Sequence, residues 1–220
     1  MRIRPCGDAM LLLVEFEAVI DPLVNEQVIA LAARIRDRRA YGVQDVAPGY
    51  CTIGIHFNPL HTDLSALEHA IEDDARSLGA IEQLPDRAPI EIGVRYGGEW
   101  GPDLDAVAAH AGCSADEVIA RHAGRIYRVY MLGFVPGFAY LGRVDSSIAI
   151  ARHRVPRERV PAGSVGIAGE QTGVYPIESP GGWHLIGRTR TAMFDAERTP
   201  PNLVSPGDFV RFVPLAAGAP

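Results

Sequence analysis

Short runs of alternating apolar and polar residues open the chain and predict β-strands. One run covers residues 2–6 and another covers 9–16, with a Gly-Asp turn at 7–8 between them. Residues 43–57 alternate in the same way, and the Pro-Gly pair at 48–49 predicts the turn of a second strand pair. The start of the chain is therefore expected to supply the strands of one sheet.

Two longer segments in the same region carry apolar residues at helical spacing. Apolar positions recur over 24–35, after Asp21 and Pro22, the usual order of an N-cap and a first helical residue. The segment 63–78 repeats the spacing and is followed by Gly79, a typical helix end. We therefore expect an α+β fold that begins with one sheet covered by two helices.

A boundary between two domains, 1–84 and 85–220, is predicted where residues 83–88 combine charges with Pro85. After one further strand, two short helices are expected, and a capping box at 114–117 opens the second. The rest of the chain consists of short apolar runs separated by glycine and proline. This pattern predicts a β-barrel or closed sandwich for the second domain.

One stretch, residues 160–191, combines frequent glycine and proline with large apolar side chains. A disordered linker of that composition would normally lack the apolar residues. We interpret it as short strands joined by sharp turns, with ligand-binding groups between them. Together with an aromatic segment at 132–142 it supplies a candidate catalytic residue, His184, and the candidate substrate-binding residues Gln171, Thr172, Tyr175, Gly181, Gly182, Trp183, Arg188, Phe134 and Phe138.

Each kind of candidate residue suggests its own chemistry. His184 is suited to proton transfer near neutral pH, and Arg188 to binding a carboxylate or phosphate through two parallel hydrogen bonds. Backbone amides around Gln171 and Thr172 suit an anion-binding turn, and the aromatic residues of 132–142 suit a pocket wall. Each candidate also has an ordinary structural interpretation. His184 would be a structural histidine, the turn at Gln171 and Thr172 a solvated hairpin tip, and the aromatic residues of 132–142 part of the core.

Composition removes several classes of function. The net charge is −6, and all 21 residues counted as Lys+Arg are arginine. Without lysine, the chain has neither a phosphate-loop lysine nor a Schiff-base lysine. An acidic total argues against a nucleic-acid binder, and there is no run of 18 apolar residues and no apolar signal core near the start. We therefore expect a cytoplasmic protein.

Sites built on a metal, a serine nucleophile or paired cysteines are not predicted. No group of His, Asp and Glu residues has metal-ligand spacing, and the G-x-S-x-G elbow is absent. The three cysteines, Cys6, Cys51 and Cys113, lie far apart and include no C-x-x-C pair. The expectation is a site with no metal ligand.

Five ordered blocks then point to a known family. They are YGGEWGPDL at 96–104, LGFVPGFAYLG at 132–142, VPAGSVGIAGEQTGVYP at 160–176, SPGGWHLIGRT at 179–189 and PGDFVRFVP at 206–214. Together they resemble the B subunits of 5-oxoprolinase, a family also called kinase-inhibitor-like or allophanate hydrolase subunit 1. The same blocks are similar to one half of the carboxyltransferase region of urea carboxylase.

The resemblance implies a small N-terminal α+β domain with two helices, followed by a cyclophilin-like β-barrel. It implies two partners, a C subunit with a related barrel and an A subunit, and an assembled enzyme that uses ATP with Mg to open 5-oxoproline to glutamate. In that assembly this chain would help to bind the oxoproline carboxylate or a phosphate, through backbone amides and Arg188. No nucleotide-binding motif is recognisable in the chain itself.

Two other roles in the same family remain open from the sequence. One is a non-catalytic inhibitor of a sporulation-type histidine kinase. The other is a component of a biotin-dependent urea or amide carboxylase, or of an allophanate hydrolase-like complex. A cyclophilin-like fold does not imply prolyl isomerase activity, because one fold supports many functions.

Overall fold

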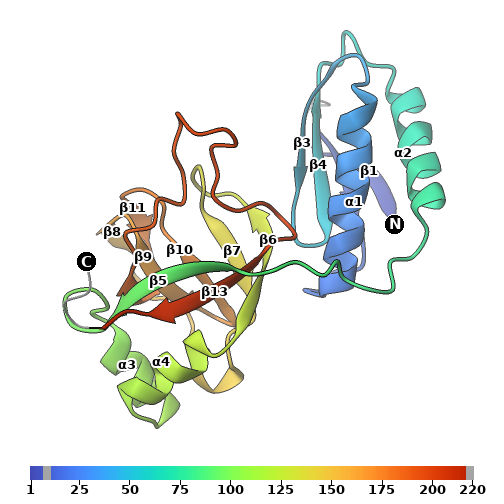
Figure 1. Cartoon of the computed structure of the whole chain (residues 1–220). Helices are drawn as coiled ribbons and strands as arrows, with labels where there is room; N and C mark the ends of the chain where they lie inside the picture. Colours follow the sequence, from blue (N-terminus) through green and yellow to red (C-terminus); the bar gives the residue numbers. More distant parts are fainter. Residues whose placement is uncertain (7–10, 217–220) are drawn as a thin grey trace. The chain divides into compact units, whose positions relative to one another are not determined.

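The computed structural model describes residues 1–6 and 11–216. It consists of two compact units, an N-terminal unit, Met1–Asp86, and a C-terminal unit, Arg87–Pro220 (Figure 1). The turn predicted at 7–8 lies outside the described residues. None of the helices in the described part of the chain has the length and apolar character needed to cross a lipid bilayer.

The N-terminal unit is one antiparallel sheet packed with two helices, as the sequence predicts. Its elements are β1 (Arg2–Cys6), β2 (Leu11–Glu15), α1 (Pro22–Arg38), β3 (Val43–Pro48), β4 (Thr52–Phe57) and α2 (Leu64–Leu78). The strand order is β1-β2-β4-β3, and each neighbouring pair is antiparallel. Local sequence rules account for this unit well, because hairpins and capped helices depend on near neighbours.

Capping and one apolar cluster hold the N-terminal unit together. The Asp21 carboxylate accepts hydrogen bonds from the backbone N–H groups of Leu23 and Val24 at 2.8 and 3.0 Å. This satisfies donors that the first turn of α1 would otherwise leave unpaired. The core joins the inner faces of both helices to the sheet and consists of Leu12, Val14, Val28, Leu31, Ala32, Ile35, Val46, Ile53, Ile55, Phe57, Leu67 and Ile71.

The C-terminal unit is a seven-stranded closed barrel with two short helices, which confirms the predicted α+β class and barrel. Its elements are β5 (Ile90–Tyr96), α3 (Leu104–Ala111), α4 (Ala115–Ala123), β6 (Ile126–Leu132), β7 (Ala139–Gly142), the 3₁₀ turn η1 (Ser146–Ile148), β8 (Arg157–Val160), β9 (Ser164–Ala168), β10 (Gln171–Val174), β11 (Ser179–Gly181), β12 (His184–Arg188) and β13 (Phe209–Pro214). The strand order around the barrel is β10-β7-β6-β13-β5-β12-β9, and β8 and β11 form a separate pair.

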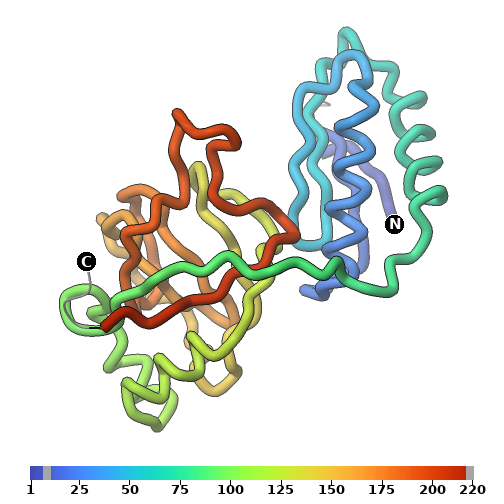
Figure 2. The backbone as a smooth tube through the Cα atoms, viewed as in Figure 1, coloured from blue at the N-terminus to red at the C-terminus, as the bar shows by residue number. Residues whose placement is uncertain are grey.

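The barrel closes by pairing the first and last strands of the C-terminal unit. Strands β5 and β13 run parallel, with Val210 opposite Ile90 and Phe212 opposite Ile92. The tube in Figure 2 shows them side by side, in green and red. Because this pairing joins residues more than a hundred positions apart, no local pattern in the sequence predicts it.

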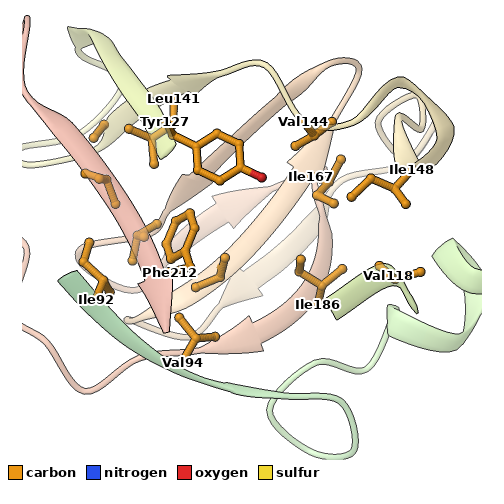
Figure 3. Close-up of a cluster of buried hydrophobic side chains, with 14 of the residues drawn as sticks. Ile92, Val94, Val118, Tyr127, Leu141, Val144, Ile148, Ile167, Ile186 and Phe212 are labelled. Atoms are coloured by element: carbon orange, nitrogen blue, oxygen red, sulfur yellow. The ribbon is translucent and has the colours of Figure 1, made fainter. Parts of the chain in front are cut away.

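The interior of the barrel is a mainly apolar core, part of which is drawn in Figure 3. Each strand contributes inward residues, such as Ile92, Tyr127 and Phe212, and Val118 of α4 belongs to the same cluster. The predicted capping box that starts α4 is present in both directions between Ser114 and Glu117. A filled interior leaves only the outer surface and rim of the barrel for ligands.

Candidate functional site

Aromatic residues form the wall of a pocket in the C-terminal unit, which we call the aromatic pocket. Its volume is about 300 Å³, and it is lined by Phe134, Phe138, Tyr140, Arg152, Pro156, Tyr175, Pro180, Gly181, Gly182 and Trp183. Six of the predicted substrate-binding residues therefore lie together. The sequence separates them by up to 49 positions, and the barrel brings their segments to one place.

Phe138 is the centre of the aromatic packing. Its buried ring makes edge contacts with Tyr140, Tyr175 and Trp183 at centroid distances of 4.8, 5.2 and 5.4 Å. Edge-to-face pairs of this kind are the favourable geometry for aromatic quadrupoles. Gly173 on β10 leaves the necessary space, because a Cβ there would lie 3.2 Å from both the Phe138 and the Trp183 ring. The wall is therefore one packed assembly.

Tyr175 is held in place beneath a glycine. A Cβ on Gly181 would lie only 2.4 Å from the Tyr175 hydroxyl oxygen, so a larger residue cannot occupy this position without movement. Burial raises the pKa of Tyr175, and a backbone hydrogen bond at Trp183 partly opposes the effect. The hydroxyl is consequently neutral at physiological pH and serves as a polar group among the aromatic rings of the wall.

Phe134 occupies the exposed rim of the aromatic pocket in an unusual backbone conformation. It has φ +68° and is 59% exposed, although its ring still contacts Phe138 edge-on at 5.6 Å. A non-glycine residue at positive φ is strained by about 1 kcal/mol or more. The tight turn from Gly133 to Phe138 imposes this conformation, with hydrogen bonds from Val135 N–H to Gly133 and from Phe138 N–H to Val135.

A second and larger cavity, which we call the arginine pocket, has a volume of about 600 Å³. It is lined by Gly93, Arg95, Trp100, Ala162, Gly163, Pro176, Arg188, Thr189, Arg190, Thr191, Ala192 and Leu215. The guanidinium carbons of Arg95 and Arg188 lie 5.2 and 5.9 Å from the centre of the Trp100 ring. Arg188, predicted to bind substrate, is therefore in a different cavity from the predicted aromatic residues.

A third group of functional side chains surrounds Asp103, the residue before α3. Its carboxylate accepts hydrogen bonds from Arg157 at 2.6 Å and from the Leu185 backbone N–H at 2.7 Å. His153 Nε2 lies 3.5 Å from the same carboxylate. Burial acts to raise the pKa of Asp103. The hydrogen bonds from Arg157 and Leu185 have the larger combined effect, so the pKa of this carboxyl is lowered from its ordinary value. Asp103 is therefore an anion at neutral pH.

His184 belongs to this group and not to the wall of the aromatic pocket. It is 8% exposed, its ring lies against the His153 ring at 3.8 Å between centroids, and its Nε2 lies 3.0 Å from the Ala151 carbonyl. Burial, followed by the neighbouring His153, lowers its pKa, so the ring is neutral at pH 7. Within the described residues, Nδ1 is buried without a hydrogen-bond partner.

The Asp103 group has donor atoms that spacing in the sequence did not reveal. One potential ligand atom from each of Asp103, His153 and His184 lies within 4.8 Å of the others. Two histidines and one carboxylate are a donor set that transition metals accept. Arg157, however, already supplies a positive charge to the carboxylate at 2.6 Å. The group is therefore charge-compensated by the protein itself.

Thr172 lies inside the barrel, which corrects its predicted contact with substrate. It is fully buried, its hydroxyl donates to the Gly166 carbonyl at 3.0 Å, and it lies 2.8 Å from His122 Nε2. On the other side of that ring, Nδ1 lies 2.8 Å from the Tyr96 hydroxyl. Thr172 points inward because side chains alternate along β10. Gln171, the residue before it, is partly exposed and lines neither pocket.

Sequence reasoning missed five residues that the structure brings to these sites: Arg95, Trp100, Asp103, His153 and Arg190. Trp100 and Asp103 belong to the block at 96–104 that carries the family resemblance, so a signal for them was present. Arg95 and Arg190 gave none, because only the tertiary fold places these two distant residues in one cavity.

Comparison with known proteins assigns the chain to a family. The family model for the carboxyltransferase domain, subdomain C and D, matches residues 1–204. The 5-oxoprolinase B subunit of Bacillus subtilis (strain 168) is 38% identical, and the alignment covers 98% of this chain and 93% of that protein. The 5-oxoprolinase B subunit of Escherichia coli O157:H7 is 43% identical, over 93% and 92%.

Solved structures support the same assignment. The crystal structure of TTHA0988 matches all of this chain at 34% identity with a TM-score of 0.84, but this chain spans only 42% of that one. A conserved uncharacterized protein of Pyrococcus horikoshii, PH0987, is 42% identical over 97% of both chains, with a TM-score of 0.57. The Kluyveromyces lactis urea carboxylase, at 20% identity and a TM-score of 0.75, supports the fold alone. The chain thus belongs to the carboxyltransferase-domain family of subdomains C and D, in the branch that contains the 5-oxoprolinase B subunits.

Proposed function

We propose that this chain is the B subunit of an ATP-dependent 5-oxoprolinase, which opens the lactam ring of 5-oxo-L-proline to give L-glutamate. The observation that carries the proposal is the similarity to two 5-oxoprolinase B subunits along more than nine tenths of each aligned chain. The A and C subunits of that enzyme are the proposed partners, as the sequence resemblance indicates. The assembled enzyme would act in the cytoplasm, where ATP is available.

The aromatic pocket is the proposed site for the lactam ring. Its volume of about 300 Å³ is at the small end of the range for ligand pockets and suits a single five-membered ring. Phe138, Tyr175 and Trp183 offer apolar contact to the methylene groups of the ring. Arg152 is the only cationic residue among the described residues that line this pocket, and it is suited to pair with the substrate carboxylate.

The catalytic role predicted for His184 stays a proposal with a defined geometry. Its neutral imidazole can accept a proton at Nδ1, and it directly follows Trp183, which lines the aromatic pocket. His184 is 8% exposed and its ring lies against the His153 ring, so direct contact with substrate requires a movement of these side chains. A His184→Gln variant that loses turnover and also loses the acidic limb of the pH–rate profile would support a role in proton transfer.

ATP with magnesium is the implied co-substrate of the assembled enzyme. When bound, it supplies a phosphoryl group to the lactam oxygen, which makes the ring carbonyl a better electrophile. The side chains of this chain fit the phosphates better than the metal, since the arginine pocket is cationic and no carboxylate is present among its described lining residues. We therefore propose that the magnesium ligands come from a partner chain.

Reconstitution tests the proposed function. The chain is purified alone and with the products of the neighbouring genes, and 5-oxoproline-dependent ATP hydrolysis and glutamate formation are both measured. We expect little turnover from this chain alone and clear turnover when the A and C subunits are added. Trp183→Ala should lower that turnover at least tenfold, because an aromatic wall residue contributes roughly 1.5–3 kcal/mol when fully buried against a ligand.

The matched control for Trp183→Ala is Tyr41→Ala, which removes a 77% exposed aromatic ring of the N-terminal unit. It should keep wild-type turnover. Failure of every combination of the chains to consume 5-oxoproline contradicts the proposal. The same preparations then decide between the other two roles, through autophosphorylation of a histidine kinase and through biotin-dependent carboxylation of urea.

A further inference from the structure

The arginine pocket has the charge and geometry of a site for a phosphate-type oxyanion. We propose that it binds a phosphate or polyphosphate group through Arg95, Arg188 and Arg190, at a place distinct from the aromatic pocket. The assignment does not depend on what the aromatic pocket binds.

The positive charge of the arginine pocket is uncompensated among its described lining residues. The pocket is lined by three arginines and, among its described lining residues, by no carboxylate. In the described part of the chain, none of these arginines forms an ion pair with Asp or Glu, whereas Arg157 and Arg38 do. A cationic cavity of this kind in a protein of net charge −6 is a local feature and not a reflection of overall composition. Such a cavity concentrates anions.

Arg95 and Arg188 are neighbours on adjacent strands. They are directly paired across the antiparallel strands β5 and β12. Residues paired in this way have Cβ atoms about 5 Å apart, and like charges there are destabilising. The Trp100 ring, which contacts both guanidinium groups, offsets part of the repulsion through cation–π attraction. A bound polyanion would neutralise the repulsion that remains between the two guanidinium groups.

The Arg188 side chain is preorganised by a hydrogen bond to the backbone. Its Nε donates to the Ala162 carbonyl at 2.8 Å, which fixes the side chain and leaves both terminal nitrogens available. The turn that presents this carbonyl requires glycine next to it, because Gly163 has φ +81° and a Cβ there would lie 2.1 Å from the Thr189 carbonyl oxygen. A guanidinium held by one nitrogen suits bidentate binding of an oxyanion by the other two.

Size and charge favour a phosphate group over the carboxylate of a ligand in the aromatic pocket. The cavity of about 600 Å³ is twice as large as the aromatic pocket, and three cations match a multiply charged anion better than one carboxylate. Trp183 lines only the aromatic pocket and Arg188 only the arginine pocket, and the two cavities have no described lining residue in common.

The test is direct binding to the isolated full-length chain. Pyrophosphate and inorganic phosphate are titrated by calorimetry, and the thermal midpoint is followed in parallel. We expect saturable binding of pyrophosphate that raises the midpoint and weakens as salt is added. Arg188→Gln should weaken binding by roughly tenfold to hundredfold, the range for one charge-assisted hydrogen-bonded contact. Arg190→Gln, at an exposed position where folding is not at risk, should weaken it severalfold.

Arg154→Gln is the matched control, because it removes the same charge from an exposed arginine outside both pockets. It should leave the affinity for pyrophosphate unchanged. The proposal is overturned if pyrophosphate gives no saturable binding at millimolar concentration, or if Arg154→Gln weakens binding as much as Arg188→Gln. Displacement of pyrophosphate by 5-oxoproline or glutamate at equal concentration would instead identify a carboxylate site and would also overturn it.

Discussion

Asp103 and Leu185 are joined by two reciprocal hydrogen bonds. The Leu185 backbone N–H donates to the Asp103 carboxylate at 2.7 Å, and the Asp103 N–H donates to the Leu185 carbonyl at 2.9 Å. Leu185 lies on β12 between Trp183 of the aromatic pocket and Arg188 of the arginine pocket. The start of α3 therefore holds β12, which follows Trp183 of the aromatic pocket and ends at Arg188 of the arginine pocket.

Replacing Asp103 with Asn tests this relationship. The amide can still accept the Leu185 bond but loses the charged partner of Arg157, so we expect a loss of about 1–3 kcal/mol in the free energy of unfolding. The lowered pKa of Asp103 means that its contribution is present above about pH 4 and is lost as pH falls through the folded pKa. Urea denaturation at several pH values measures both effects. Asp86→Asn, an exposed control, should change neither, and equal stability of the Asp103→Asn and wild-type proteins would count against the role.

A buried histidine predicts how the C-terminal unit responds to acid. Burial lowers the pKa of His122 to about 3, from an unfolded value near 6.5. Between pH 6.5 and about pH 3, His122 is protonated in the unfolded chain but not in the folded chain. The free energy of unfolding therefore decreases as the pH is lowered through this range. The expected loss is about 2 kcal/mol at pH 5. His122→Gln should lower stability at pH 7 but flatten this dependence, while His110→Gln, at an exposed site, should leave the slope unchanged.

A methyl group on Gly181 should disturb the aromatic pocket. In Gly181→Ala the added Cβ would lie 2.4 Å from the Tyr175 hydroxyl oxygen, so the tyrosine must move. We expect a loss of about 1–3 kcal/mol in stability and lower turnover in the reconstituted enzyme. Gly182→Ala is the control for stability, since its Cβ would meet nothing closer than 3.6 Å. A Gly181→Ala protein with wild-type thermal midpoint would show that Tyr175 is not confined as described.

Replacing Phe134 should affect turnover more than it affects the stability of the fold. In Phe134→Gly, relief of the positive φ opposes the greater backbone entropy of glycine, so stability should change by less than about 1 kcal/mol. Turnover should nevertheless fall severalfold, because the rim of the aromatic pocket loses its ring. The thermal midpoint, and the turnover and KM of the reconstituted enzyme with 5-oxoproline, are the measurements. A large loss of stability with unchanged KM would mean that Phe134 has a structural role only.

Much of the fold follows from rules that act over a few residues. The capping box at Ser114–Glu117 and the helix over 63–78 are predicted correctly, because capping and helical periodicity depend on neighbours three or four positions apart. The aromatic residues of the pocket are also identifiable, since large apolar groups between glycines and prolines must pack against something. Thr172 was misplaced because alternation within a short strand does not reveal which face lies inside the barrel.

The sequence by itself determined the class of the fold, the family and the aromatic composition of one pocket. Tertiary structure alone decided which polar groups meet. Asp103 reaches Leu185 across 82 positions and Arg157 across 54, and Arg95 faces Arg188 only through the register of β5 and β12. The physical reason is that barrel closure is set by hydrogen bonding between distant strands, and a shift of one residue between β5 and β12 would end the direct pairing of Arg95 with Arg188.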